Sequence, residues 1–290
     1  MKKYELCALM AALLWGLTGI FTRTLNSMGL VSMGIVMVRC LSSAIMFAVL
    51  LLIREPKGFK IKWKDAWLFF GSGVLSLLAF TFCYFNAIEL MTLSTAAILL
   101  YTSPIFVMLV SVPLFKEKIT GMKIVCLILA FAGCCLVSGL GGAINLKGVL
   151  YGLGAGIGYA AYSIFARLAL DKGYSSNTVN FYSCLLAALG SGIIGGFAQP
   201  LQMTFAFLPN FLLVLAIGFV SCFLPYLVYT YALTGCEPSR ASIICTAEPV
   251  SATLVGVIVF EEALTIPAII GILLTLTAIV LLNIPQKGKT

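Results

Sequence analysis

"SPIFVMLVSVPLFKEKIT" (residues 103–120) returns further along the chain as "AEPVSATLVGVIVFEEALT" (247–265). Both stretches have a proline near the start of an apolar run, and an acidic residue followed by a threonine near its end. Four identities at a constant offset define the match: Pro104/Pro249, Phe115/Phe260, Glu117/Glu262 and Thr120/Thr265. This fixed spacing predicts that the chain contains two copies of one structural unit.

The repeat extends towards the N-terminus of each copy. The segment "IFTR" (20–23) matches "IFAR" (164–167), and the same spacing relates Gly29/Gly173, Cys40/Cys184 and Leu41/Leu185. One residue of drift separates this region from the later one, which also pairs Tyr84/Tyr229, Ala87/Ala232, Ser94/Ser239 and Ala96/Ala241. We therefore predict two duplicated units, residues 1–143 and 144–290.

The composition is that of a membrane protein. Hydrophobic residues make up 61% of the 290 residues and charged residues only 10%, against about 45–50% and about 25% in soluble domains. Apolar runs long enough to cross about 30 Å of hydrocarbon predict an all-α integral membrane protein. The ten expected spans are residues 5–23, 31–53, 66–88, 93–115, 121–139, 148–167, 176–198, 209–233, 240–260 and 266–284.

The basic residues predict the orientation, because Lys and Arg collect in cytoplasmic loops. With the N-terminus inside, only Arg23 and Lys147 fall outside, and Arg39 falls within a span. The fifteen remaining basic residues are Lys2, Lys3, Arg54, Lys57, Lys60, Lys62, Lys64, Lys116, Lys118, Lys123, Arg167, Lys172, Arg240, Lys287 and Lys289. We expect both termini on the inner side of a prokaryotic-type cytoplasmic membrane.

Five spans per unit is an odd number, so the second unit is expected to be inverted relative to the first. Inverted repeats are typical of alternating-access transporters, with the substrate near the midplane between the two halves. Ten spans in one chain can enclose such a cavity, so a monomer is sufficient, although an oligomer is not excluded.

Several other functions lack support in the sequence. The net charge of +8 comes mostly from residues at span ends, which does not favour a nucleic-acid-binding protein. The basic stretch "REPKGFKIKWK" (54–64) is best explained as a topology anchor beside anionic lipid, not as a binding patch. The chain has no histidine, and its ten cysteines form no C-x-x-C pair, so neither a metal site nor a disulfide framework is expected. No nucleotide-binding P-loop motif occurs, and no cofactor is expected.

An ordered set of motifs carries a family resemblance across the whole chain. It comprises "AALLWGLTGIFTR" (11–23), "VRCLSSAIMF" (38–47), "YFNAIEL" (84–90), "YTYAL" (229–233) and the two opening stretches. The set resembles the EamA-type, ten-helix branch of the drug/metabolite transporter (DMT) superfamily. The resemblance implies secondary transport of small metabolites or amino acids, often outward, through a cavity lined by spans 1, 3, 4, 6, 8 and 9.

Two charged residues inside spans are the main candidates for substrate binding or coupling. An ionised acid at the bilayer centre costs about 2.5–3.5 kcal/mol on the mildest scale, yet Glu248 lies about eight residues into its span. It either binds a substrate amine, carries a coupling proton, or is a structural residue that is protonated or bonded to a neighbouring helix. Arg39 lies at a similar depth and either pairs with Glu248 or binds a substrate carboxylate.

Prolines and aromatic residues complete the candidate site. Pro104, Pro225 and Pro249 are expected to bend their helices beside the cavity, because proline removes a backbone hydrogen bond. Aromatic rings at mid-span are not explained by the interfacial belt, and they serve either a substrate pocket or ordinary packing. The main aromatic candidates are Trp15, Tyr84, Tyr101, Tyr159 and Tyr229, and the further mid-span tyrosines are Tyr162, Tyr182 and Tyr226.

The predicted function is secondary export of a small polar or zwitterionic, amino-acid-like metabolite, with possible proton coupling through Glu248. One alternative is transport of an organic cation or amine, bound by Glu248 and an aromatic cage. A remote alternative is an integral-membrane enzyme, for which Glu261 and Glu262 form the only adjacent acidic pair. We therefore expect a transporter and no enzyme.

Overall fold

The computed structural model describes residues 2–139 and 145–284, and every regular element in these ranges is helical. Ten helical segments are long and apolar enough to cross a membrane, which confirms the predicted number. They are Lys3–Ser27, Ser32–Arg54, Trp63–Leu90, Leu93–Phe115, Gly121–Ser138, Leu146–Asp171, Ser176–Gly195, Leu208–Leu233, Pro238–Phe260 and Ile266–Asn283. The predicted limit between units at residue 143, together with Lys287 and Lys289, lies outside the described residues.

Several spans consist of more than one helix. The α-helices are α1 (Lys3–Gly16), α2 (Thr18–Ser27), α3 (Ser32–Arg54), α4 (Ala66–Phe70), α5 (Ala79–Leu90), α6 (Leu93–Leu100), α7 (Ser103–Phe115), α8 (Gly121–Ser138), α9 (Leu146–Asp171), α10 (Ser176–Gly195), α11 (Ala198–Ala206), α12 (Leu208–Gly218), α13 (Leu224–Leu233), α14 (Pro238–Ile244), α15 (Ala247–Phe260) and α16 (Ile266–Asn283). Helix α11 was not expected from the sequence, which favoured a direct connection between the seventh and eighth spans.

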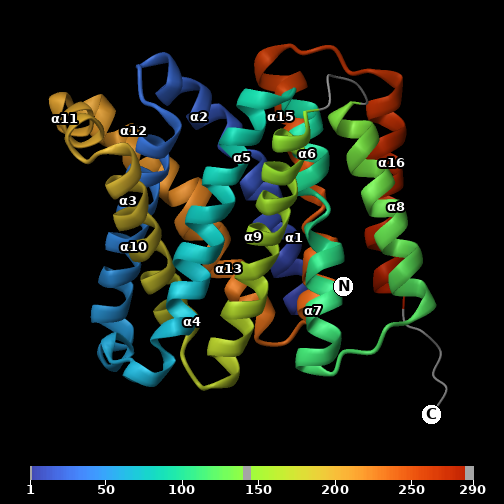
Figure 1. The fold of residues 1–290 in the computed structure, drawn as a ribbon, viewed down its shortest axis with the longest axis horizontal. Coiled ribbons are helices and arrows are strands. Elements are labelled where there is room, and N and C mark those ends of the chain that lie inside the picture. The colour runs from blue at the N-terminus through green and yellow to red at the C-terminus, as the bar shows by residue number, and fades with distance from the viewer. Residues whose placement is uncertain (1, 140–144, 285–290) are drawn as a thin grey trace.

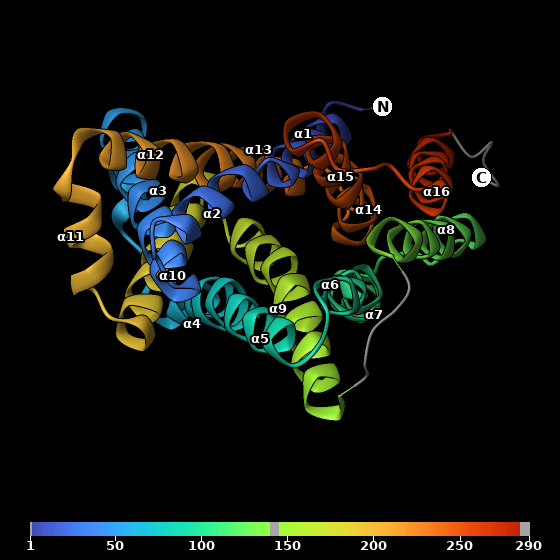
Figure 2. The same ribbon diagram turned by 90° about the horizontal axis from the view of Figure 1, so that it is seen from above.

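Viewed along the bundle, the helices form two sides with a pair at one edge (Figure 2). Helices α1, α13 and α15 lie along one side, and α5, α6, α7 and α9 along the other. Helices α8 and α16 pack together at one edge, while α11 lies at the opposite edge. Candidate residues of both units therefore face one another across the middle of the bundle.

The contact between α8 and α16 depends on two glycines. A Cβ on Gly271 would lie 2.6 Å from the carbonyl oxygen of Gly133 and 2.8 Å from the backbone nitrogen of Val137. A Cβ on Gly133 would in turn lie 2.7 Å from the carbonyl oxygen of Gly271. Small residues allow membrane helices to approach this closely, so the two backbones leave no room for a larger side chain.

We expect Gly271→Ala to lower the thermal midpoint of the purified protein by at least about 3 °C, because overpacking costs about 1–3 kcal/mol. Gly121→Ala in α8 is the matched control, since a Cβ at Gly121 meets nothing within 4 Å. The measurement is thermal unfolding of both variants in the same detergent. Equal midpoints for the two variants would contradict the close approach.

Two spans are interrupted where the repeated prolines predict it. Helix α6 ends at Leu100 and α7 begins at Ser103, with Pro104 in its first turn. Helix α14 ends at Ile244 and α15 begins at Ala247, two residues before Pro249. Pro225 does not interrupt its span. It lies at the start of α13, just after the π-helical segment Phe219–Phe223, and the span remains helical throughout. The wider π turn provides space beside a residue that cannot donate a backbone hydrogen bond.

Local structure recurs at the repeated positions. Lys116 and Glu261, which follow α7 and α15, both adopt a left-handed conformation with φ of 54° and 55°. Thr120 and Thr265 both cap the next helix through their hydroxyl groups. The α7–α8 and α15–α16 connections nevertheless lie at opposite ends of the bundle (Figure 1).

Candidate functional site

A cluster of aromatic rings surrounds a small cavity between the two sides of the bundle. The Trp15 ring centre lies 5.2 Å from that of Tyr226, 5.3 Å from Tyr229 and 6.2 Å from Tyr159. The cavity between the rings has a volume of about 10 Å³, which is room for roughly one water molecule. The cavity is lined by Trp15, Ser76, Leu77, Phe80, Tyr159, Tyr162, Ser163, Tyr226 and Tyr229.

Trp15 reaches this cluster because α1 lies directly against α15. A Cβ on the neighbouring Gly16 would come within 2.5 Å of the Ser251 side chain and 2.8 Å of the backbone nitrogen of Ala252. The Ser251 hydroxyl also donates a hydrogen bond of 2.9 Å to the carbonyl oxygen of Leu13. Glycine at position 16 thus positions the indole ring among tyrosines of the second unit.

Glu248 lies at the edge of the cluster, in the first turn of α15. Its carboxylate accepts a hydrogen bond of 2.7 Å from the Tyr159 hydroxyl. The first turn of a helix has free N–H groups and the positive end of the helix dipole, both of which favour a carboxylate. The break before α15 therefore explains how an acid is accommodated inside this span. Tyr84 and Tyr101 lie close enough for the charge of Glu248 to act on them.

Arg39 lies in α3, near Tyr226 of the aromatic cluster. The side chains that interact most strongly with its guanidinium group by electrostatics are Cys40, Cys222 and Tyr226. Its Nε is buried without a hydrogen-bond partner, and no carboxylate of the described residues lies within 4.0 Å of its guanidinium. Arg39 and Glu248 influence each other electrostatically but do not form an ion pair.

The structure thus brings most of the predicted site residues together. Trp15, Tyr159 and Tyr229 line one cavity, and Tyr84 and Tyr101 lie within electrostatic range of Glu248. Ser76, Phe80 and Ser163 also line the cavity. They were not predicted, because in the sequence they do not differ from ordinary span residues. Tyr162 and Tyr226, which the sequence placed among the mid-span tyrosines, belong to the same cluster.

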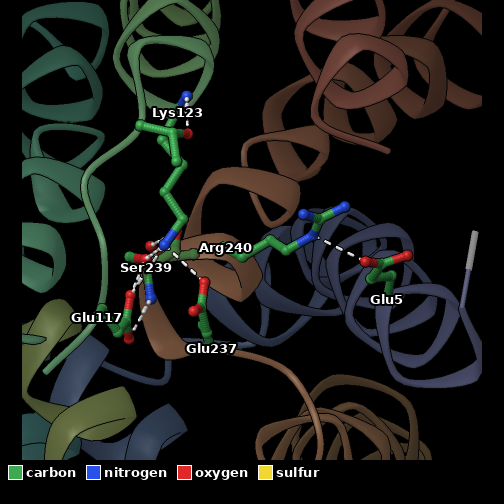
Figure 3. Close-up of polar contacts among 8 residues, drawn as sticks. Glu5, Glu117, Lys123, Glu237, Ser239 and Arg240 are labelled. Atoms are coloured by element: carbon green, nitrogen blue, oxygen red, sulfur yellow. Dashed lines mark hydrogen bonds and ion pairs between the residues drawn. The ribbon is translucent and has the colours of Figure 1, made fainter. Parts of the chain in front are cut away.

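A buried ion-pair network lies at the end of the bundle where α1 begins and α7 joins α8 (Figure 3). The ammonium group of Lys123 lies 2.6 Å from Glu237, 3.4 Å from Glu117 and 3.2 Å from the Ser239 hydroxyl. Ser239 also hydrogen-bonds to Glu117 through its hydroxyl. The side chains of Lys123 and Glu117 are only 8% and 3% exposed, whereas Glu237 is 49% exposed, so the network is buried on the side of Glu117 and reaches solvent at Glu237.

A second ion pair extends this network to α1. The Nε of Arg240 lies 2.8 Å from the carboxylate of Glu5, although its N–H is not aligned for a hydrogen bond. Glu5 also accepts a 2.7 Å hydrogen bond from the backbone of Lys2. Helices α1, α8 and α14 are therefore tied together at this end of the bundle.

The opposite end has a weaker connection. Arg23 donates to Glu262 at 2.8 Å, and both side chains are about half exposed, at 55% and 51%. Arg23 also lies 4.2 Å from the ring centre of Phe260. An exposed pair of this kind contributes about 0–1 kcal/mol, so the two ends of the bundle are closed by interactions of different strength.

Comparison with known proteins places the chain in a family. An uncharacterized transporter of Archaeoglobus fulgidus is 29% identical over 284 residues, covering 93% of this chain and 95% of that protein. The uncharacterized transporter YwfM of Bacillus subtilis is 24% identical over 294 residues, covering 99% and 96%. A crystal structure that is 18% identical shares the fold, with a TM-score of 0.80 over 97% of this chain and 96% of that chain.

The model of the EamA-like transporter family matches this chain twice, over residues 2–139 and 146–284. The two matches together cover most of the described residues, including the aromatic cluster, Arg39 and Glu248. Both the family and the relatives point to transport and not to catalysis. The chain belongs to the EamA-like transporter family.

Proposed function

We propose that this protein is a secondary transporter that exports small zwitterionic, amino-acid-like metabolites across the cytoplasmic membrane by alternating access. The observation that carries the proposal is the separation of two buried, opposite charges without an ion pair between them. Arg39 retains an unpartnered Nε, and the protein hydrogen bond found for the Glu248 carboxylate comes from Tyr159. A carboxylate at Arg39 and an ammonium group at Glu248 would complete both sites.

Rings of the aromatic cluster lie near both charges and shape the space proposed for the substrate. Trp15 contacts tyrosines on both sides, with Tyr226 towards Arg39 and Tyr159 towards Glu248. The cavity has room for about one water molecule in this conformation. Substrate binding therefore requires the rings to separate, which fits a protein that opens to each side in turn.

Opening alternates between the two ends of the bundle, and the two units are inverted relative to each other. The connections that follow α7 and α15 lie at opposite ends, as an inverted repeat requires. The exposed Arg23–Glu262 pair opens at lower energetic cost than the buried Lys123 network, because exposed ion pairs contribute little. With the N-terminus inside the cell, the end that opens at lower cost faces outward.

Any proton coupling would pass through Glu248. It is the one acid among the described residues that contacts the aromatic cluster, through Tyr159. A proton on its carboxyl group would compete with a substrate ammonium group for the same site. Exchange of one for the other would couple substrate release to proton entry.

A second candidate substrate is an organic cation without a carboxylate. The observation in its favour is the group of Tyr159, Tyr226 and Tyr229 around Trp15, next to the carboxylate of Glu248. Aromatic faces attract cations in such a cage. Under this alternative Arg39 has no role in binding.

Arg39→Gln separates the two candidates. In proteoliposomes, we expect the wild type to catalyse counterflow of at least one labelled amino acid. The variant should be at least about tenfold slower, because it loses a charged hydrogen bond worth about 1.5–3 kcal/mol. Arg54→Gln, at the exposed end of the same helix, is the control and should retain the wild-type rate.

The same assay shows when the zwitterion assignment is wrong. If the wild type moves simple amines but no amino acid, and Arg39→Gln does so equally well, the substrate is a cation. Thermal unfolding of both variants verifies that they are folded. A wild type that moves neither class, in either direction, contradicts the proposed substrate type altogether.

A further inference from the structure

A basic pocket lies between the loop that joins α3 to α4 and the turn that joins α9 to α10, which meet at the same end of the bundle (Figure 1). Its volume is about 440 Å³, and its walls include Lys57, Lys60, Lys62 and Lys172. The sequence alone suggested only a topology anchor for this loop. A pocket of this size is within the range of small-ligand sites.

The pocket has fixed walls because the loop is fastened to the second unit. The Tyr174 hydroxyl donates a 2.8 Å hydrogen bond to Asp65, which also pairs with Lys172. The Thr178 hydroxyl donates to the carbonyl oxygen of Gly58 at 3.0 Å. A further hydrogen bond of 2.7 Å joins the Tyr182 hydroxyl to the carbonyl oxygen of Phe59.

The charge of the pocket is not balanced by the protein. The lining contains four lysines and one acid, Glu55, which accepts a hydrogen bond from Asn177. Asp65, which is not part of the lining, pairs with Lys172. No carboxylate of the described residues lies within 4.0 Å of the ammonium groups of the other three lysines. Lys57, Lys60 and Lys62 are exposed, so they give the pocket a net positive charge that is accessible to an anion from outside the protein.

The surroundings of the pocket indicate where that anion comes from. Trp63, in the same loop, is 91% exposed, and Ile53 at the end of α3 is 75% exposed. Exposed tryptophan beside apolar span residues is typical of the level of lipid headgroups. The pocket therefore opens where phospholipid phosphates are concentrated, and basic pockets at this level bind anionic headgroups.

We propose that this pocket binds the phosphate of an anionic phospholipid headgroup. The phosphate contacts Lys57, Lys60 and Lys62, while the acyl chains lie along the apolar surface that includes Ile53. The bound lipid bridges the loop of the first unit to the α9–α10 turn of the second. This site is separate from the transport cavity, so it does not depend on the proposed substrate.

The test compares two double variants that remove the same charge from the same region. Lys57→Gln/Lys60→Gln changes the lining, whereas Arg54→Gln/Lys64→Gln changes neighbours that do not line the pocket. Binding of phosphatidylglycerol to each purified protein is titrated in detergent by native mass spectrometry, with phosphatidylcholine as the reference lipid. We expect at least about tenfold weaker phosphatidylglycerol binding in the first variant and little change in the second.

Other outcomes overturn the proposal in distinct ways. Equal losses in both variants mean that the loop attracts anionic lipid by its overall charge, without a specific pocket. Binding of inorganic phosphate as tight as that of phosphatidylglycerol means that the site takes a soluble anion. No preference for phosphatidylglycerol over phosphatidylcholine in the wild type rules out the site.

Discussion

Replacing Glu248 with glutamine is expected to abolish the stabilisation of the purified protein by its substrate and to slow transport at least about tenfold. The substitution keeps the shape of the side chain and removes the charge that would pair with a substrate ammonium group. A ligand stabilises the folded state in proportion to ln(1 + [L]/Kd). The measurement is the thermal midpoint in the presence of amino acids and small amines, followed by counterflow with the ligand that gives the largest shift.

Two controls identify the part that Glu248 plays. Glu261→Gln makes the same chemical change just beyond the end of α15, at an exposed residue, and should respond to ligand as the wild type does. Tyr159→Phe keeps the carboxylate but removes its hydrogen bond, so a smaller loss of affinity is expected. If Glu248→Gln responds to ligand as strongly as the wild type, Glu248 is no substrate contact. If substrate exchange by the Glu248→Gln variant also persists but no longer responds to a pH gradient, Glu248 serves proton coupling alone.

The sequence predicted the fold well because a membrane leaves few choices. Apolar runs long enough to span hydrocarbon must be helical, since each backbone group has to be satisfied within the segment. The number of spans and the breaks near Pro104 and Pro249 follow from this rule and from proline chemistry. Helix α11 (Ala198–Ala206) was missed because it is too short and too polar to give a spanning signal.

The candidate site was only partly predictable. Charges and aromatic rings inside spans identified Glu248, Arg39 and Trp15, because such residues are unusual in hydrocarbon. Their mutual positions depend on how helices from distant parts of the chain pack, which periodicity does not reveal. The sequence left open whether Arg39 and Glu248 form an ion pair. The structure shows that they do not, and this depends on the packing of α3 and α15 around the aromatic cluster.

The ion-pair network around Lys123 was not predicted at all. In the sequence Lys123 counted only as a basic residue near a span end, and Glu117 only as the partner of Glu262 in the repeat. Charges near span ends usually face water, so nothing indicated that these two side chains would be buried together. The network nevertheless ties α8 to the residues around the start of α14, and its removal should have the second large effect.

Lys123→Gln is expected to destabilise the protein and to open the end of the bundle where α1 begins. Removing one partner of a buried ion pair costs about 3–5 kcal/mol, because Glu117 is 3% exposed and would keep an unpaired charge. Cys236 reports the opening: it is 5% exposed and lies close enough to Glu5 and Arg240 for their charges to act on it. Maleimide labelling of the Cys236 peptide, quantified by mass spectrometry, should rise severalfold.

A double variant separates opening from simple instability. Lys123→Gln/Glu117→Gln removes both buried charges, so most of the lost thermal stability should return, while Lys123 no longer ties α8 to Glu237. Labelling of Cys236 should then remain high in a stable protein. Lys118→Gln is the control: Lys118 is a nearby basic residue outside the network's ion pairs, so its replacement should change neither stability nor labelling. If labelling returns to the wild-type level together with stability, the network serves folding alone, and the closure that governs access lies elsewhere in the bundle.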